Sequence, residues 1–208
     1  MSTYVAPVKD MLFAMNELAG LQEIVGLPGN EDVSSDLVEA ILDEAGKFAS
    51  EVVDPLNKVG DKQGNKWNNG VVTTADGFKE AYAEYVAGGW QGLSHPKEYG
   101  GQELPMSLNM LKSEMMGTAN WSFTMYPGLS LGCMNTVYQF GNTEQKNTYM
   151  PKLVSGEWTG TMCLTEPHCG TDLGQVKTKA DPAGDGTYKI TGTKIFISAG
   201  EHDLAENI

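Results

Sequence analysis

The sequence contains no arginine: all 14 of its basic residues are lysines, against 27 acidic residues, which gives a formal net charge of −13. This shortage of positive charge argues against nucleic acid or an anionic membrane surface as a partner, because both attract cationic protein surfaces. Arginine is also the residue that usually binds a pyrophosphate through two parallel hydrogen bonds. A dinucleotide would therefore be held here by backbone groups, hydroxyls and lysines, or by a segment outside this chain.

Cysteine and histidine are scarce, with three of each. The spacing of Cys133, Cys163 and Cys169 matches neither a zinc site nor a redox CxxC motif, and the histidines are too scattered for a metal cluster. We therefore expect no metal site and reduced thiols. No N-terminal apolar run is long enough for a signal peptide or a membrane span, so a cytoplasmic protein is expected. Hydrophobic residues make up 40% of the chain, enough for a buried core.

Helical periodicity dominates the chain as far as Gly156, where a glycine ends the last helical pattern. Helices are predicted over residues 11–25, from Ser34 to just before Pro55, and over residues 76–87, 106–118, 129–140 and 143–155, with a loop over residues 59–69. In the second of these helices, one apolar stripe is predicted to face the core; it consists of Leu37, Ile41, Ala45, Phe48, Ala49 and Val52.

After Gly156 the pattern becomes β-prone, with strands predicted over residues 158–164, 175–180 and 188–198 and a hairpin loop over residues 181–187. The expected fold is mainly α: an N-terminal extension (1–33), a helical domain (34–157) and the start of an antiparallel β-domain (158–208). Such a partial sheet leaves open edges. We expect either that another chain covers it or that the sequence is a fragment of a longer protein.

Two short motifs carry the strongest functional signal. Residues 162–172 read Met-Cys-Leu-Thr-Glu-Pro-His-Cys-Gly-Thr-Asp, a strand that breaks at Pro167 and continues into a turn with Gly170 and Thr171. Backbone N–H groups and hydroxyls in such a turn can cradle a phosphate. Residues 194–200 read Lys-Ile-Phe-Ile-Ser-Ala-Gly. Strand alternation is predicted to place Phe196 and Ser198 on one face, where an aromatic ring and a hydroxyl suit a planar cofactor.

These motifs resemble those of the acyl-CoA dehydrogenases, and residues 92–104 resemble the glycine-rich connector of the same family. The resemblance covers essentially the whole chain and is strongest to the bacterial branch that includes 3-methylthiopropionyl-CoA dehydrogenase. It implies an oxidoreductase that uses FAD to convert an acyl-CoA to the 2-enoyl-CoA. The flavin-binding residues implied by the resemblance are Met162, Leu164, Thr165, Gly170, Thr171, Phe196 and Ser198.

The resemblance also implies an acyl-CoA site formed by Thr171, Gly128 and Leu131. It implies that the catalytic base is a glutamate in a C-terminal domain outside these residues, so that no catalytic residue is expected here. Electron-transferring flavoprotein as the partner of the intact enzyme, and a homo-oligomer, are implied too. Two alternatives remain open: a non-catalytic helical interaction module left by truncation, and a flavin-binding protein of unrelated chemistry.

Overall fold

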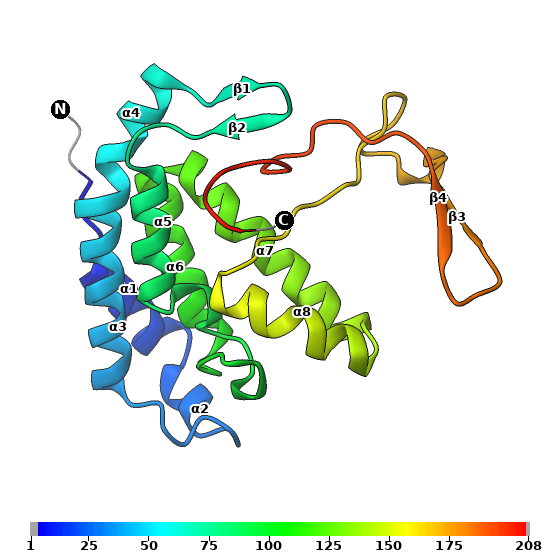
Figure 1. The fold of residues 1–208 in the computed structure, drawn as a ribbon. Helices are drawn as coiled ribbons and strands as arrows, with labels where there is room; N and C mark the ends of the chain where they lie inside the picture. Colours follow the sequence, from blue (N-terminus) through cyan, green and yellow to red (C-terminus); the bar gives the residue numbers. More distant parts are fainter. Residues whose placement is uncertain (1–3, 207–208) are drawn as a thin grey trace.

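The N-terminal segment consists of two short helices beside the longer helix α3 (Ser35–Phe48), as Figure 1 shows. The structure is a computed structural model and describes residues 4–206, so the ends of the expected N-terminal extension and β-domain (1–3 and 207–208) lie outside it. Helix α1 (Val8–Phe13) continues into a π-helical turn (Ala14–Leu18), and α2 (Leu21–Val25) follows. The single helix predicted over residues 11–25 is wrong, because Gly20 adopts a left-handed φ of 67° and interrupts it.

The helical run that begins with α3 does not stop before Pro55 as predicted. It passes through a π-helical turn (Ala49–Val53) into α4 (Asp54–Gln63), where Pro55 occupies the first turn. Proline is tolerated there because the π turn already departs from the regular i→i−4 hydrogen bonding, so the missing N–H costs little. The predicted loop over residues 59–69 is consequently half helix, and its remainder begins the hairpin of β1 (Lys66–Asn68) and β2 (Val71–Thr73).

Helix α5 (Phe78–Ala87) leads into the glycine-rich connector, which contains two 3₁₀ turns (Trp90–Gly92 and Lys97–Tyr99). The connector folds back on itself: a Cβ on Gly101 would lie only 2.1 Å from the carbonyl oxygen of His95, so only glycine fits. The connector thereby delivers the chain to α6 (Met106–Ala119). The glycines of this motif therefore have a structural role: they permit a tight reversal of the chain between packed helices.

Helices α7 (Trp121–Phe140) and α8 (Thr143–Ser155) complete the helical part. Helix α7 begins earlier than the predicted residue 129 because Asn120 caps it: its side chain accepts from the Phe123 amide at 3.1 Å and donates to the carbonyl of Val53 at 3.2 Å. The core between these helices and α3 and α5 is built around aromatic rings and long apolar side chains that are at most 2% exposed: Leu42, Tyr82, Tyr85, Met115, Met116 and Phe123.

Residues 161–200 form an arm, called here the C-terminal arm, that extends away from the helices (Figure 1). Its ordered strands are β3 (Lys179–Pro182) and β4 (Tyr188–Thr191), which pair as an antiparallel hairpin and are exposed along their whole length. The predicted strand over residues 158–164 is wrong, and the two others are much shorter than predicted. A strand needs a paired neighbour, and the described residues supply one only where β3 and β4 face each other.

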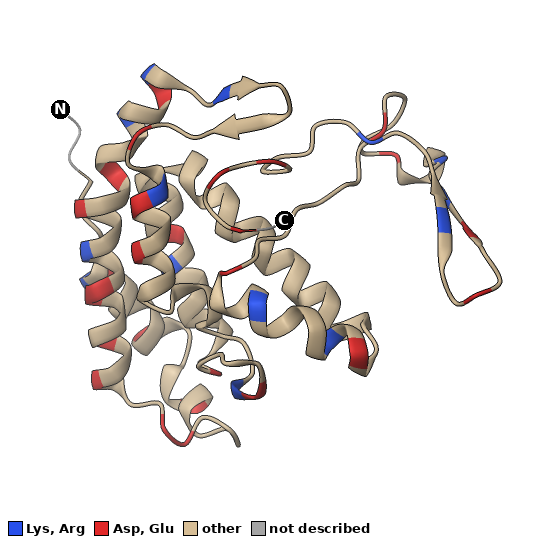
Figure 2. Ribbon diagram, in the orientation of Figure 1, with Lys and Arg blue, Asp and Glu red and all other residues tan. Residues whose placement is uncertain are grey.

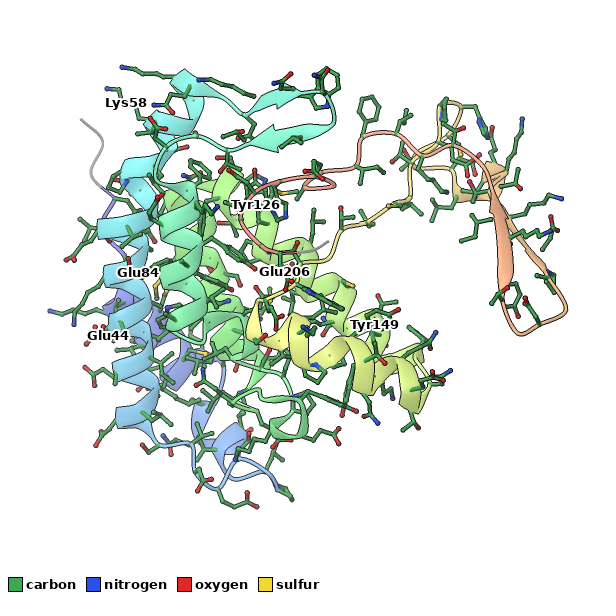
Figure 3. All side chains as sticks on the ribbon, in the orientation of Figure 1. Glu44, Lys58, Glu84, Tyr126, Tyr149 and Glu206 are labelled. Carbon is green, nitrogen blue, oxygen red and sulfur yellow. The ribbon has the colours of Figure 1, made fainter. Side chains whose placement is uncertain are left out.

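The chain then returns to the helices through residues 201–206, which cross α7 near Tyr126 (Figure 3). The carboxylate of Asp203 accepts hydrogen bonds from the amide and hydroxyl of Thr74 at 3.1 and 2.7 Å. Buried His202 accepts at Nδ1 from the amide of Leu204, which leaves Nε2 to donate to the Thr159 hydroxyl at 3.1 Å. Burial lowers the pKa of His202, so the ring is held neutral in this contact.

The expected mainly α fold with small antiparallel strand pairs is confirmed. Figure 2 shows acidic residues distributed along α3, α4 and α5. Among residues 4–206, no helix is both long and apolar enough to cross a membrane.

Candidate functional site

A mostly apolar cavity of about 300 Å³ lies between α6 and α7. Gly128 and Leu131, the residues predicted to contact the acyl chain, both line it. An added Cβ on Gly128 would meet no atom within 4 Å, so this face of α7 is open. The apolar part of the lining comes from Met110, Met116, Trp121, Met125, Leu129 and Leu131. An apolar slot of this kind suits an aliphatic chain.

A second hollow, of about 440 Å³, lies between α7 and the root of the C-terminal arm. Met162, predicted to border the flavin, lines it together with Gly128 and Gly132. Because Gly128 and Leu129 line both spaces, the two are neighbours across one turn of α7. The structure thus brings a residue predicted for the flavin and a residue predicted for the acyl chain to the same place.

The root of the arm is fixed against α7 by close backbone contact. A Cβ on Gly160 would lie 2.3 Å from the Cβ of Cys133, so only glycine permits this approach, and the Gly160 amide donates to the Ser130 hydroxyl at 3.0 Å. Burial raises the pKa of the Cys133 thiol, which therefore stays protonated beside the hollow. These contacts position Met162 at the edge of the hollow.

The two sequence motifs lie side by side, although they do not form a regular sheet. The Thr161 hydroxyl donates to the carbonyl of Ser198 at 2.6 Å, the Lys194 ammonium to the carbonyl of Leu164 at 3.0 Å, and the Ile195 amide to the carbonyl of Thr165 at 2.8 Å. From the pair Thr161–Ser198 to the pair Thr165–Ile195, residue numbers rise on one segment as they fall on the other, so the segments run antiparallel. Leu164 and Thr165 therefore lie beside residues 194–195, and Ser198 lies beside Thr161.

The predicted geometry of Phe196 and Ser198 is wrong. Phe196 has a left-handed φ of 57° and is 86% exposed, so the regular alternation that would place both side chains on one strand face is broken. Of the hydrogen bonds described between the two segments, only that of the Ile195 amide pairs backbone with backbone, which is too little to impose extended backbone on the neighbouring residues. Phe196 lines neither the cavity nor the hollow.

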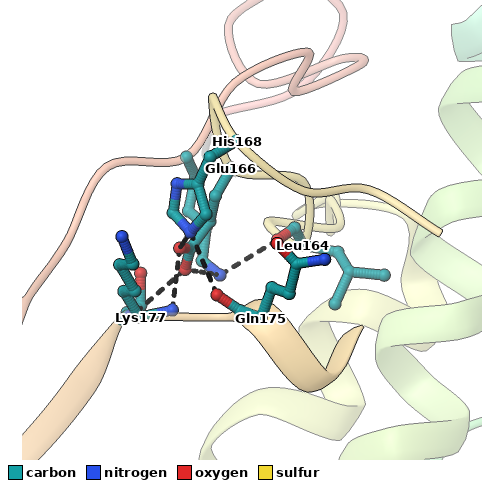
Figure 4. A network of polar contacts seen from close by, with 7 residues as sticks. Leu164, Glu166, His168, Gln175 and Lys177 are labelled. Atoms are coloured by element: carbon teal, nitrogen blue, oxygen red, sulfur yellow. Dashed lines mark hydrogen bonds and ion pairs between the residues drawn. The ribbon is translucent and has the colours of Figure 1, made fainter. Parts of the chain in front are cut away.

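Glu166 is the centre of a polar network at the turn of the first motif (Figure 4). Its carboxylate accepts from the amides of Lys177 and Thr178 and from the ammonium of Lys194, each at 2.9 Å. Hydrogen bonding from Thr178, followed by that from Lys194 and Lys177, holds the pKa of Glu166 well below its usual range. A carboxylate already occupied by three donors holds the turn in shape and is not a free base.

At that turn, Thr171 is exposed and Gly170 is partly exposed. The neighbouring Asp172 is engaged within the turn, because its side chain accepts from the Gly174 amide at 3.2 Å and from the Gln175 side chain at 2.7 Å. Thr171 borders neither the cavity nor the hollow, so the structure leaves it apart from Gly128 and Leu131. Its exposed hydroxyl remains open to a phosphate group approaching along the arm.

A buried cation, Lys112, was not predicted as part of the site. It lines the α6–α7 cavity, is 5% exposed, and donates to the hydroxyl of Tyr85 at 3.0 Å and to the carbonyl of Trp90 at 3.2 Å. Burial lowers its pKa to about 7. The signal in the sequence is its position four residues after Leu108 and four before Met116, which places a charge on the buried stripe of α6.

The flavin expected from the resemblance fits the residues of the hollow in one respect: Gly128 and Gly132 offer an open, side-chain-free surface on α7 beside Met162. A planar ring can approach helix backbone closely only where side chains are missing. The turn with Gly170 and Thr171 presents an exposed hydroxyl, and the sequence has no arginine, so hydroxyls, lysines and backbone N–H groups are the donors that it offers to a pyrophosphate.

Comparison with known proteins identifies the family. The model of the acyl-CoA dehydrogenase N-terminal domain matches residues 35–157. The chain is 43% identical over 206 residues to 3-methylmercaptopropionyl-CoA dehydrogenase of Ruegeria pomeroyi (strain ATCC 700808 / DSM 15171 / DSS-3), a match covering 99% of this chain and 35% of that protein. The chain thus spans about a third of that relative's length, and the expected resemblance to its bacterial branch is confirmed.

Solved structures of acyl-CoA dehydrogenases resemble this chain in fold. Butyryl-CoA dehydrogenase from Megasphaera elsdenii is 27% identical with a TM-score of 0.67, over 79% of this chain and 41% of that chain. Acyl-CoA dehydrogenase complexed with FAD from Bacillus anthracis is 30% identical with a TM-score of 0.64, over 80% and 27% respectively. With the helical fold and both sequence motifs in place, this chain belongs to the acyl-CoA dehydrogenase family.

Proposed function

We propose that this chain is the N-terminal part of an FAD-dependent acyl-CoA dehydrogenase that oxidises an acyl-CoA to the 2-enoyl-CoA. Residues 34–157 would be its helical domain, and residues 158–208 would begin the β-domain that carries the flavin motif. The observation that carries the proposal is the shared boundary at Gly128, where an apolar cavity suited to an acyl chain adjoins the hollow bordered by Met162. Dehydrogenation requires substrate and oxidant to meet in this way.

Each part of the chain would have a distinct task. Leu131 and the methionines of the cavity would bind the aliphatic chain, and Gly128 would leave room where that chain meets the flavin. Met162, Leu164, Thr165 and Ser198 would border the ring, Phe196 would shield it after rearrangement of the arm, and Gly170 and Thr171 would receive phosphate oxygens. FAD would supply the acceptor for the hydride lost from the β-carbon.

The α-proton would be removed by a base outside these residues, since Glu166 is fully engaged in the turn. The 208-residue chain by itself is therefore expected to oxidise no acyl-CoA and to hold FAD weakly. By family, electron-transferring flavoprotein would reoxidise the flavin of the intact enzyme, and the enzyme would be a homo-oligomer.

The test uses the protein encoded by the complete reading frame that contains these residues, purified with its flavin. Gly128→Phe would fill the junction of the two spaces, so we expect acyl-CoA to bleach the flavin absorbance of the parent protein but not of this variant. Gln139→Phe is the matched control, because it adds the same ring at an exposed position of α7 that lines neither space. Bleaching of Gly128→Phe at the parental rate, or a colourless parent protein, would contradict the proposal.

A further inference from the structure

Lys112 is a buried cation with no carboxylate to balance it among its hydrogen-bond partners, which are the Tyr85 hydroxyl and the Trp90 carbonyl. Buried lysines are rare, and they are retained where they pair with a group or receive a ligand. An ammonium has three N–H donors, and the described residues accept two of them. One hydrogen-bonding position of Lys112 therefore remains, and the side chain borders the α6–α7 cavity.

A second polar group in the same cavity has an unused hydrogen-bonding position. Gln91 is 4% exposed; its side-chain amide donates to the carbonyl of Pro127 at 3.4 Å, whereas its Oε1 has no hydrogen-bond partner within residues 4–206. A buried oxygen left without a donor costs about 1–3 kcal/mol. With Lys112 protonated, these two polar side chains from different elements leave one donor and one acceptor position at the mostly apolar cavity.

Their place in the fold indicates which part of a ligand they would contact. Gly128 and Leu129 connect the cavity to the hollow of Met162, whereas Gln91 and Lys112 belong to the connector and α6 and do not border that hollow. A chain that enters from the hollow would pass Gly128 first. Its distal end would be the part that reaches the polar pair.

We propose that the α6–α7 cavity selects acyl chains whose distal end carries a hydroxyl group, and that Lys112 and Gln91 are the residues that recognise it. The proposal rests on the proposed function, which makes this cavity an acyl site. A hydroxyl fits both positions because it can donate to Oε1 of Gln91 while accepting from Lys112. A methyl end would leave both groups without a hydrogen-bond partner. A carboxylate could accept from Lys112, but it has no donor for the Gln91 oxygen.

The test uses the 208-residue chain and probes without CoA, so it does not depend on flavin or CoA binding. 6-Hydroxyhexanamide and heptanamide have the same length and differ in an OH against a CH₃. Affinities would be measured by NMR titration of the methionine methyl groups of the cavity. We expect the hydroxy probe to bind at least about tenfold more tightly, the discrimination that sites built for a hydroxyl reach or exceed.

Lys112→Met replaces the ammonium by an apolar, unbranched side chain one atom shorter and should abolish that preference, whereas Lys79→Met, at an exposed position of α5, should leave it unchanged. Gln91→Leu should reduce the preference in part. Circular dichroism of each variant would establish that it is folded, and Gln91→Leu provides an independent reading if Lys112→Met does not fold. Equal binding of the two probes, binding of neither, or a preference that survives Lys112→Met would overturn the proposal.

Two further probes of the same chain length test whether the cavity prefers a different end group. Tighter binding of the monoamide of adipic acid would overturn the hydroxyl assignment in favour of a carboxylate, and tighter binding of 5-(methylthio)pentanamide would overturn it in favour of a thioether. Failure of all probes in a chain whose full-length parent still reduces its flavin with acyl-CoA would reject this inference alone. Preference for the hydroxy probe in a protein without dehydrogenase activity would reject the proposed function alone.

Discussion

The helical part of the molecule and the C-terminal arm are stabilised in different ways. Side chains such as Leu42 and Met115 are completely buried between helices, whereas every residue of β3 and β4 is exposed. The arm depends on polar contacts instead: the Glu166 carboxylate and its three donors, and the hydrogen bonds that join the two motifs. The helical part thus has an apolar core, while the arm keeps its two sequence motifs side by side with little apolar burial.

The largest effect is expected from truncation in the helical core. Leu42→Ala removes a fully buried side chain and should lower the free energy of unfolding by about 2–5 kcal/mol, because lost burial and a residual cavity add together. Ile190→Ala, at a position of β4 that is 76% exposed, should change it by less than about 0.5 kcal/mol. Urea unfolding followed by circular dichroism measures both. Similar losses for the two variants would contradict the contrast between core and arm.

A smaller effect, dependent on pH, is expected from Lys112. Burial lowers its pKa from 10.5 to about 7, so between these values the unfolded chain holds a proton that the folded chain lacks. The stability of the wild type relative to Lys112→Met should therefore rise with pH from about 7, by up to about 1.4 kcal/mol per unit. Below pH 7 both states carry the proton, and the difference should be constant.

The quantity to follow is the difference in unfolding free energy between the wild type and Lys112→Met, because other groups titrate in a neighbouring pH range. Burial raises the pKa of Tyr82 and Tyr85 from 10.0, which makes stability fall above about pH 10 in both proteins. Unfolding in urea at half-unit steps between pH 6 and 10 gives the slope. A difference that does not change with pH would mean that Lys112 stays charged in the folded state.

The smallest effect on global stability is expected at Glu166, where the change should be local to the arm. Glu166→Gln keeps the shape but removes the charge that holds Lys194, so the amides of Lys177 and Thr178 should exchange with solvent roughly tenfold faster. The urea midpoint of the helices should not move. His168→Gln is the control, because that ring lies 3.4 Å from the carboxylate but is itself partly exposed.

The pH dependence of amide hydrogen exchange at Lys177 and Thr178 tests the role of the Glu166 carboxylate further. Because the folded pKa of Glu166 is below its usual value of 4.5, its contribution should be complete above pH 4.5 and should be lost only in stronger acid. Hydrogen exchange monitored by NMR at several acidic pH values would follow it. Loss of protection already near pH 5 would show that the carboxylate is not held as the structure indicates.

The sequence was least reliable where two neighbouring residues are both apolar. In the stripe predicted for the helix after Ser34, Ala45, Phe48 and Ala49 are buried. Leu37 is exposed and Ile41 and Val52 are only partly buried against the core, where Val38, Leu42 and Val53 are fully buried instead. In each case the next residue along the chain is also apolar, so periodicity alone cannot decide which of the two faces inward. Packing against α6 and the π-helical turn, which adds a residue to the helical repeat, decided it.

The sequence by itself determined the helical character, the glycine stop at Gly156 and the family, because each depends on local residue chemistry. It also singled out Gly128, Leu131 and Met162, through the family resemblance. Only the tertiary structure decided that these three border adjoining spaces, and that Lys112 and Gln91 share one of them. Those side chains lie far apart in the sequence, and their meeting depends on how helices pack and where the arm is anchored, which no local pattern records.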